Sequence, residues 1–284
     1  MWFKKDYSEY KPEKLPTNRK EQFFDTLKHN IPTLLLIGFI FLLFCLPILV
    51  SVFVRDFYFA AYLSAYQKEE ITAEQLTSLT RSLLKTMNIV ISCCYIFLSV
   101  PVAGISKIMR RFIWSEQVFF LSDFFTGIME NILKTLVFSV ILAASIYGLY
   151  SLKTISNLPW FLEYMPYGVF AIIILPFFLH FMVLMNIYSQ PIGKTIMNSF
   201  MMYFKTPFLT ILFAVLPLIS IYLIGLIGYI GIWFLVHALM IVVFLPIYLL
   251  LWFTYEISFL DKRVNEVLFP EIYKKGLYVD KSDS

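Results

Sequence analysis

Charged residues are scarce in this sequence of 284 residues. Only 15% are Asp, Glu, Lys or Arg, whereas 60% are hydrophobic, 19% are aromatic and the mean hydropathy is +0.76. Soluble domains carry about 25% charged residues and about 45–50% apolar residues. A core of this size cannot bury such an excess of apolar surface, so most of it must face lipid. The composition therefore excludes an ordinary soluble domain and predicts an integral membrane protein.

Cysteine is also rare, and the known sequence motifs of catalysis are missing. Cys45, Cys93 and Cys94 all lie within apolar runs, without the spacing of a zinc site. We expect them to be small buried side chains. The sequence contains no Gly-rich phosphate loop, HExxH, GxSxG or CxxC. We therefore predict no catalytic residue, no cofactor and no metal site, and we do not expect an enzyme.

Long apolar blocks make up most of the chain. Their hydrophobicity is continuous rather than alternating, which indicates helices. Crossing the hydrocarbon layer takes about 20 helical residues, and the last block, 207–255, is long enough for two helices joined at the "GLIG" of Gly225–Gly228. We therefore predict an all-α, polytopic membrane protein with six transmembrane helices, at about 31–54, 87–105, 132–150, 165–188, 207–226 and 229–255.

The basic residues lie mostly on one side of these predicted spans. Segments 1–30, 106–134, 189–206 and 256–284 hold 18 of the 23 Lys and Arg residues, and the opposite side holds 5. Because cytoplasmic loops carry the excess of Lys and Arg, we predict a multi-pass protein of the cell membrane with both termini in the cytoplasm. The N-terminal segment 1–30 would include an amphipathic helix, and 256–284 would be a cytoplasmic tail.

The largest outer region, 55–86, contains a helix start. In "ITAEQL", Thr72 is the expected N-cap and Gln75 completes a capping box. The preceding stretch "RDFYFAAYLSAY" would extend the first span beyond the membrane.

Three stretches of the chain resemble one another when each is read into the span that follows. They begin "FFDTLKHN", "FFTGIMEN" and "SFMMYFKT", and their alignment pairs the following residues: Phe24, Phe125, Phe200, Asn30, Asn131 and Thr206. The helix of the second stretch would follow Ser122, which is its expected N-cap. Apolar composition alone can produce similarity of this degree, so chance stays an alternative. A genuine repeat predicts three tandem helical hairpins around a pseudo-threefold axis, each preceded by a cytoplasmic amphipathic helix.

Prolines fall within five of the six predicted spans, at Pro47, Pro101, Pro176, Pro217 and Pro246. They could act as hinges, but we favour ordinary kinked packing because proline is common in membrane helices.

The loop between the second and third spans holds the strongest cluster of cations. Lys107, Arg110 and Arg111 could bind anionic lipid headgroups or a protein partner. The alternative, which we favour, is that they anchor the loop and pair with its own acids, Glu116 and Asp123.

Polar side chains within the spans are few, and no Asp, Glu, Lys or Arg lies near the centre of any predicted span. The candidates are His180, Asn186 and His237, with Glu256 at the inner end of the last span. The two histidines could form a proton relay or a metal pair. We favour neutral histidines hydrogen-bonded between helices, because two histidines without a carboxylate make a weak metal site.

The stretch "VPVAGISKIMRRFIWSEQVFFLSDFFTGIMENILKT" resembles the signature of the YesL-like family of bacterial membrane proteins. The matching features are listed in chain order: Pro101, Ala103–Gly104, Arg110–Arg111, Glu116 and Asp123–Phe125. The resemblance covers about residues 20–255, although the outer loop 55–86 is longer and the C-terminal tail extends beyond the family's usual end. The family has no assigned activity, but its members often accompany genes for polysaccharide breakdown and sugar import.

These observations support three hypotheses of function. The first is a non-catalytic accessory or scaffold linked to carbohydrate uptake, with the lipid bilayer and a sugar-import transporter complex as partners and no nucleic acid. The second is a small-solute transporter or channel with a path lined by the polar residues within the spans: Asn88, Ser92, Ser99, His180, Asn186 and His237. The third, a lipid-handling enzyme, has the least support because no nucleophile or acid–base pair is evident.

Overall fold

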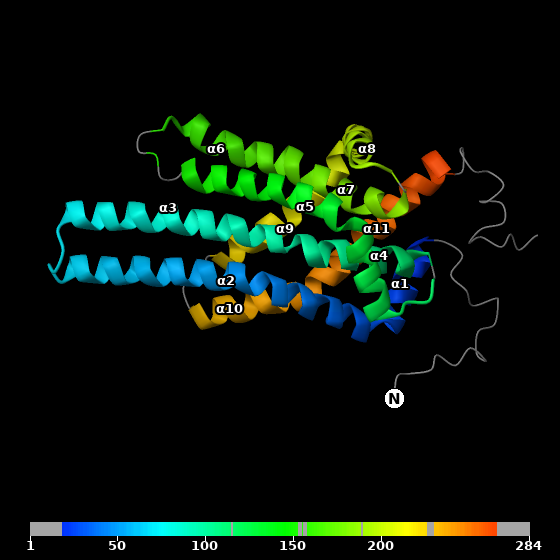
Figure 1. Ribbon diagram of the computed structural model, residues 1–284, viewed down its shortest axis with the longest axis horizontal. Helices are drawn as coiled ribbons and strands as arrows, with labels where there is room; N and C mark the ends of the chain where they lie inside the picture. The colour runs from blue at the N-terminus through cyan, green and yellow to red at the C-terminus, as the bar shows by residue number, and fades with distance from the viewer. Residues whose placement is uncertain are drawn as a thin grey trace, which may run out of the picture.

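The computed structural model describes residues 19–114, 116–152, 155, 158–188, 190–225 and 230–265 (Figure 1). In these ranges every regular element is a helix and no strand is found. The α-helices are α1 (Arg19–His29), α2 (Ile31–Gln67), α3 (Ala73–Phe97), α4 (Ser99–Ile113), α5 (Phe120–Leu152), α6 (Trp160–Val169), α7 (Leu175–Ile187), α8 (Ile192–Lys205), α9 (Pro207–Gly225), α10 (Ile230–Leu239) and α11 (Leu245–Leu260). Three short π-helical segments adjoin them, η3 (Phe170–Ile174), η4 (Met240–Phe244) and η5 (Asp261–Asn265).

The helices are long and apolar enough for a polytopic membrane protein. Five helices of the described residues could each cross a bilayer, namely Ile31–Gln67, Ala73–Ile113, Phe120–Leu152, Trp160–Ile187 and Gly231–Leu260. A sixth span is reached when α8 and α9 are taken together, although they meet at an angle of 102°. This confirms the predicted all-α membrane class.

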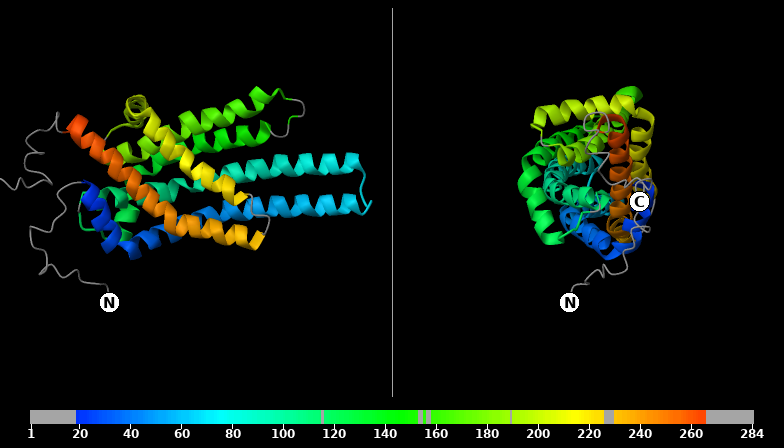
Figure 2. Two further views of the ribbon diagram at one scale, coloured as in Figure 1. Left: turned by 180° about the vertical axis from the view of Figure 1, so that it is seen from behind. Right: turned by 90° about the vertical axis from the view of Figure 1, so that its right-hand side faces the viewer.

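The spans form three hairpins that run along the long axis of the molecule (Figure 1). The hairpins are α2 with α3–α4, α5 with α6–α7, and α9 with α10–α11. We call the end that holds α1, α8 and the last turn of α11 the α1 end, and the end that holds the α2–α3 turn the loop end. The α2–α3 hairpin reaches farther at the loop end than the other two hairpins do (Figure 2).

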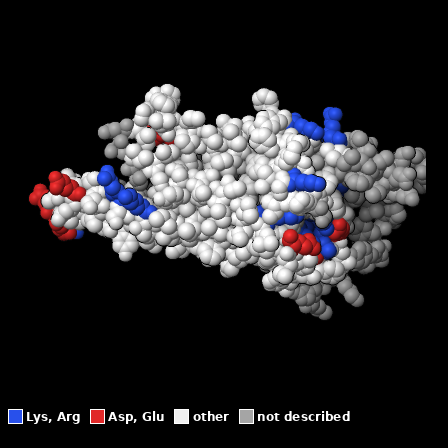
Figure 3. All heavy atoms as spheres, turned by 45° about the horizontal axis from the view of Figure 1, so that its top comes forward, with Lys and Arg blue, Asp and Glu red and all other residues white. Residues whose placement is uncertain are grey.

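Charged side chains gather at the two ends of the visible face, and the surface between them is almost free of charge (Figure 3). This distribution is typical of a protein whose middle faces hydrocarbon and whose ends reach the headgroups and water.

The centre of the bundle at the α1 end is formed by three inner helices, α4, α7 and α11, which contact one another. Most of their residues are buried, including Ile108, Phe181 and Trp252. The α2, α5 and α9 helices pack around them and expose large apolar side chains, of which Phe208 is 90% exposed. This arrangement has the three-hairpin layout that the repeat predicts.

Proline marks the start of each inner helix. Pro176 and Pro246 are the second residues of α7 and α11, and a π-helical segment ends just before each helix. Pro101 is the third residue of α4, which follows a break at Leu98. Proline has no N–H to donate, and its ring crowds the carbonyl four residues earlier. A wider π turn or a break relieves that crowding, so these prolines shape the inner helices.

Two glycines allow helices to approach closely. A Cβ at Gly38 of α2 would overlap the carbonyl oxygen of Val242 in η4, which is the carbonyl four residues before Pro246. A Cβ at Gly127 of α5 would lie 2.9 Å from the carbonyl oxygen of Ala103 in α4. Small residues often permit such backbone contacts between membrane helices.

The second predicted amphipathic helix is not a separate element. Residues 122–131 belong to α5, which continues without a break to Leu152. The helix also begins at Phe120 rather than after Ser122, because the Asp123 carboxylate accepts a hydrogen bond from the Phe119 N–H at 2.7 Å. By contrast, α1 and α8 are separate helices, as predicted. The chain between Ser122 and Asn131 has no residue that interrupts helical hydrogen bonding, so the continuous helix is favoured.

The predicted capping box is confirmed at the start of α3. The Gln75 N–H donates to Thr72 Oγ1 at 3.3 Å, and the Thr72 N–H donates to Gln75 Oε1 at 2.9 Å. The "GLIG" turn lies largely in 226–229 and the end of the C-terminal tail in 266–284, both outside the described residues.

Candidate functional site: a buried His–Glu pair

His180 of α7 and Glu256 of α11 form an ion-pair contact inside the bundle. His180 Nδ1 lies 2.7 Å from Glu256 Oε1, and both side chains are 0% exposed. Titratable residues buried among transmembrane helices are rare, because lipid makes their charge costly, and they often mark functional sites. The pair is therefore the leading candidate site in the described part of the chain.

The other ring nitrogen of His180 contacts α9. His180 Nε2 lies 3.1 Å from Thr210 Oγ1, and Thr210 Oγ1 lies 3.2 Å from Thr206 Oγ1. The Thr210 hydroxyl donates to the Thr206 carbonyl oxygen at 2.6 Å. Helices α7, α9 and α11 therefore meet at one polar site.

Packing fixes the orientation of the imidazole. The Trp252 indole meets the His180 ring edge to face, with ring centroids 5.3 Å apart, and the indole N–H donates to the Leu179 carbonyl oxygen at 3.0 Å. One tryptophan on α11 thus holds both the ring and the backbone of α7. With both ring nitrogens engaged, His180 has a defined geometry toward Glu256 and Thr210.

The hydrogen bonds indicate how many protons the site holds. A threonine hydroxyl has one hydrogen, and Thr210 donates it to the Thr206 carbonyl oxygen. In that arrangement His180 Nε2 is the donor to Thr210 Oγ1. The short contact between Nδ1 and Oε1 then holds one proton between the two groups. A pair that shares this proton is neutral overall, which avoids the cost of a net charge in the bundle.

Glu256 has an oxygen with no hydrogen-bond partner. In the described part of the chain, Oε2 is buried and receives no hydrogen bond.

Asn186 lies near the end of α7 and joins a second polar contact. The Asn131 side chain of α5 donates to Asn186 Oδ1 at 3.0 Å, and Asn186 Nδ2 donates to the Met182 carbonyl oxygen at 2.9 Å. Arg110 Nη1 also donates to the Asn186 carbonyl oxygen at 3.2 Å. Asn186 thus ties α7 to α4 and α5.

His237 has different partners from His180. It lies on α10, half-buried, where its Nδ1 is 2.9 Å from the carbonyl oxygen of Trp233 and its ring stacks against that indole at 4.1 Å. Among the described residues, no hydrogen bond links His237, Asn88, Ser92 or Ser99 to His180 or Asn186.

The three predicted loop cations each have an acidic partner. Lys107 Nζ is 2.7 Å from Glu130 Oε1, and the Lys107 side chain is only 8% exposed. Arg111 lies 2.9 Å from Asp123 and 3.3 Å from Glu116, which is also 3.6 Å from Arg110.

Exposure and stacking complete the description of this loop. The Arg110 and Arg111 side chains are 21% and 25% exposed, so solvent reaches part of each guanidinium. Arg110 also lies 4.9 Å above the Trp114 ring. The ion pairs with Glu116 and Asp123 are those expected if the arginines anchor the loop.

A buried pair at the α1 end was not predicted. Arg19 of α1 lies 2.8 Å from Asp261 Oδ2, and it also donates to Gln22 and to the carbonyl oxygen of Ile113. Gln22 in turn donates to the Phe112 carbonyl oxygen at 3.0 Å. α1 is thereby fastened to the ends of α4 and α11. Arg19 and Asp261 are 242 residues apart, and nothing in the sequence pattern pairs them.

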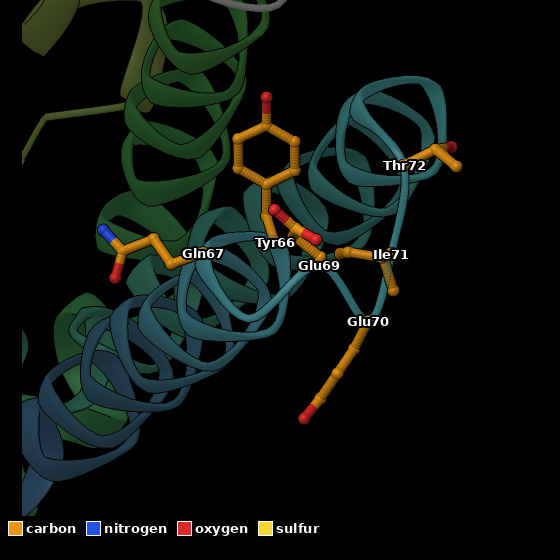
Figure 4. A pocket seen from close by; sticks show the side chains of 6 residues that line it. All are labelled: Tyr66, Gln67, Glu69, Glu70, Ile71 and Thr72. Carbon is orange, nitrogen blue, oxygen red and sulfur yellow. The ribbon is translucent and has the colours of Figure 1, made fainter.

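Two surface pockets lie at the loop end. One surrounds the α2–α3 turn and is lined by Tyr66, Gln67, Glu69, Glu70, Ile71 and Thr72 (Figure 4). The other follows one face of α3 from Ala73 to Lys85. In the close view, Glu70 points away from the other side chains, so these groups do not converge on one point. The described residues hold no group of three or more His, Cys, Asp or Glu that could bind a metal ion.

Comparison with known proteins gives no relative: no family model, curated protein or solved structure matches the chain. The resemblance to the YesL-like family therefore stays a prediction from the loop sequence.

Proposed function

We propose that this protein is a non-catalytic integral membrane protein that serves as an accessory or scaffold for carbohydrate uptake or utilisation. The observation that supports it is the packed centre at the α1 end, where Lys107, Arg110 and His180 each contact a partner within the chain. Such a centre supports a structural role rather than a path for a solute. The link to carbohydrate rests on the resemblance of residues 100–135 to the YesL-like family.

Co-purification from native membranes tests this proposal. A tagged chain is expected to recover subunits of a sugar-import transporter after crosslinking in intact cells. The matched control is a tagged, unrelated six-span protein at the same expression level. Recovery of no transporter subunit, together with unchanged sugar uptake when the gene is deleted, would contradict the proposal.

We also propose that both termini are cytoplasmic, because 18 of the 23 Lys and Arg residues lie on the side of the termini. Single cysteines in a variant without the three natural ones test this. A Glu70→Cys variant should react with a membrane-impermeant thiol reagent on intact cells, and a Lys194→Cys variant only after the membrane is opened. The reverse labelling pattern would overturn the orientation.

The second candidate function is a small-solute transporter or channel. The observation that favours it is the His180–Glu256 pair, because ionisable groups at membrane depth often belong to transport sites. Purified protein in proteoliposomes should then take up solute faster than empty vesicles, and Glu256→Gln should abolish the difference. Uptake that equals that of empty vesicles across a panel of sugars, amino acids and ions would exclude this function.

A further inference from the structure

Four side chains form an unbroken series of polar contacts from a helix junction to the interior. Thr206 Oγ1 lies 3.2 Å from Thr210 Oγ1, Thr210 Oγ1 lies 3.1 Å from His180 Nε2, and His180 Nδ1 lies 2.7 Å from Glu256 Oε1. Hydroxyl, hydroxyl, imidazole and carboxyl groups all accept and release protons without moving far.

The series begins near the surface of the protein and ends at buried residues. Lys205 is exposed and Thr206 is half-buried, whereas Thr210, His180 and Glu256 are fully buried. Thr206 follows the last residue of α8 and precedes α9, where the chain turns by 102°. α8 is seen end-on in Figure 1, across the direction of the spans. Because the turn is at the α1 end, water and headgroups can reach Thr206.

We propose that His180 and Glu256 form a proton-binding site, which exchanges its proton with water at the α8–α9 turn through Thr210 and Thr206. The ligand is the proton itself, and the site needs no other co-reactant. This inference stands apart from the proposed accessory function, since the site binds its proton whether or not a solute crosses the membrane.

The transfer conserves every atom. Before uptake, Thr210 donates to Nε2, and Nδ1–H donates to the Glu256 carboxylate. A water proton then binds Thr206 Oγ1, the Thr206 hydroxyl proton moves to Thr210, and the Thr210 proton moves to Nε2. The Nδ1 proton is shared with Oε1, and no bond between heavy atoms changes. In the arrangement of the structure, the Thr210 hydroxyl donates to the Thr206 carbonyl oxygen at 2.6 Å and the Thr206 hydroxyl donates to the Met202 carbonyl oxygen at 3.3 Å. This arrangement corresponds to the proton-loaded state, and both hydroxyls rotate toward the series when a proton passes along it.

Three buried or half-buried cations of α1 and α4 have other partners. Arg19 of α1 pairs with Asp261, Lys107 of α4 with Glu130, and Arg110 of α4 with Glu116. α9 carries no Asp, Glu, Lys, Arg or His, and the other titratable residues of α11 are Tyr248 and Tyr255. His180 is therefore the only ion-pair partner of Glu256 among the described residues.

Nuclear magnetic resonance of the full chain in lipid vesicles, with ¹⁵N-labelled histidine, tests the site. The chain has three histidines, and His180→Asn identifies the signal of interest. In the wild type, His180 should show hydrogen on Nε2 and a shared proton at Nδ1. In Glu256→Gln, one ring nitrogen should lose its proton. A wild-type His180 with one bare nitrogen, unchanged by Glu256→Gln, would overturn the proposal.

Hydrogen–deuterium exchange of the His180 ring tests the route. Thr210→Val keeps the side-chain shape but removes the relay hydroxyl, and it should slow exchange by about 100-fold or more, the usual contribution of a positioned proton carrier. Thr210→Ser should restore exchange. The control is Thr254→Val on α11, whose buried hydroxyl donates to the Leu250 carbonyl oxygen outside the series. Exchange in Thr210→Val at the wild-type rate, or equal slowing in Thr254→Val, would refute the route.

Discussion

The buried His180–Glu256 pair makes a quantitative prediction through a double-mutant cycle. Neutral hydrogen bonds between membrane helices contribute on average about 0.6 kcal/mol and at most about 1.7 kcal/mol. Removing one partner of a buried ion pair instead costs about 3–5 kcal/mol, because the remaining group is left buried without compensation. Both side chains are fully buried and their polar atoms lie 2.7 Å apart, so we expect the larger cost of a buried ion pair.

The cycle compares His180→Ala, Glu256→Ala and the double variant. Each single change should lower the free energy of unfolding by about 3–5 kcal/mol. The double variant should be at least as stable as the less stable of the two single variants, since neither group is then left alone. The coupling energy between the two positions should therefore be at least about 3 kcal/mol, above the range of neutral contacts.

Reversible unfolding in mixed detergent micelles, followed by tryptophan fluorescence, provides the measurement. Glu256→Gln serves as the shape-matched control, because its amide keeps a hydrogen bond to His180 while the shared proton is lost. It should cost less than Glu256→Ala. A coupling energy near 0.6 kcal/mol would mean that the pair is an ordinary neutral contact, and the argument for a shared proton would fail.

Three further predictions concern packing and caps. Gly38→Ala should lower the free energy of unfolding by about 1–3 kcal/mol through overpacking against η4, whereas Gly148→Ala, which meets nothing within 4 Å, should leave it unchanged or raise it by up to about 1 kcal/mol. Arg19→Ala should release α1 and make it cleavable by trypsin, because Asp261 loses its buried cation; protection equal to wild type would contradict this. Thr72→Ala should cost about 1 kcal/mol, seen as faster amide exchange in the first turn of α3.

Local features of the fold could be predicted because their causes lie within a few residues. The continuous apolar runs identify the spans, and Thr72 with Gln75 identifies the start of α3 since both halves of the capping box are three residues apart. The prolines predict kinks, and the structure places Pro101, Pro176 and Pro246 in the first turn of the three inner helices.

The predicted helix before the third span failed for a different reason. The likeness of the three stretches predicted a separate helix before each span, but similar residues do not require the chain to bend at the same place. A bend needs an interruption of the backbone, and Asn30 before α2 and Thr206 before α9 provide one. Asn131 does not interrupt its helix, and its side chain donates a hydrogen bond to Asn186 on α7. The aligned residues Asn30, Asn131 and Thr206 therefore differ in role. Asn30 and Thr206 each lie between two helices, whereas Asn131 lies within α5 and links it to α7.

The pairing of Glu256 with His180 was not predicted, because a sequence gives the position of a residue along its own helix but not its height relative to a residue on another helix. Glu256 lies ten residues after Pro246, whereas His180 lies four residues after Pro176. If the two prolines lay at the same depth, Glu256 would lie six residues deeper along its helix than His180, which is about 9 Å at 1.5 Å per residue. Helices α10 and α11 run at a slant across the bundle (Figure 2), and the two side chains meet at 2.7 Å despite that offset. Because Gly38 packs against η4, which leads into α11, a substitution at Gly38 should alter the His180 ring signal as well as stability.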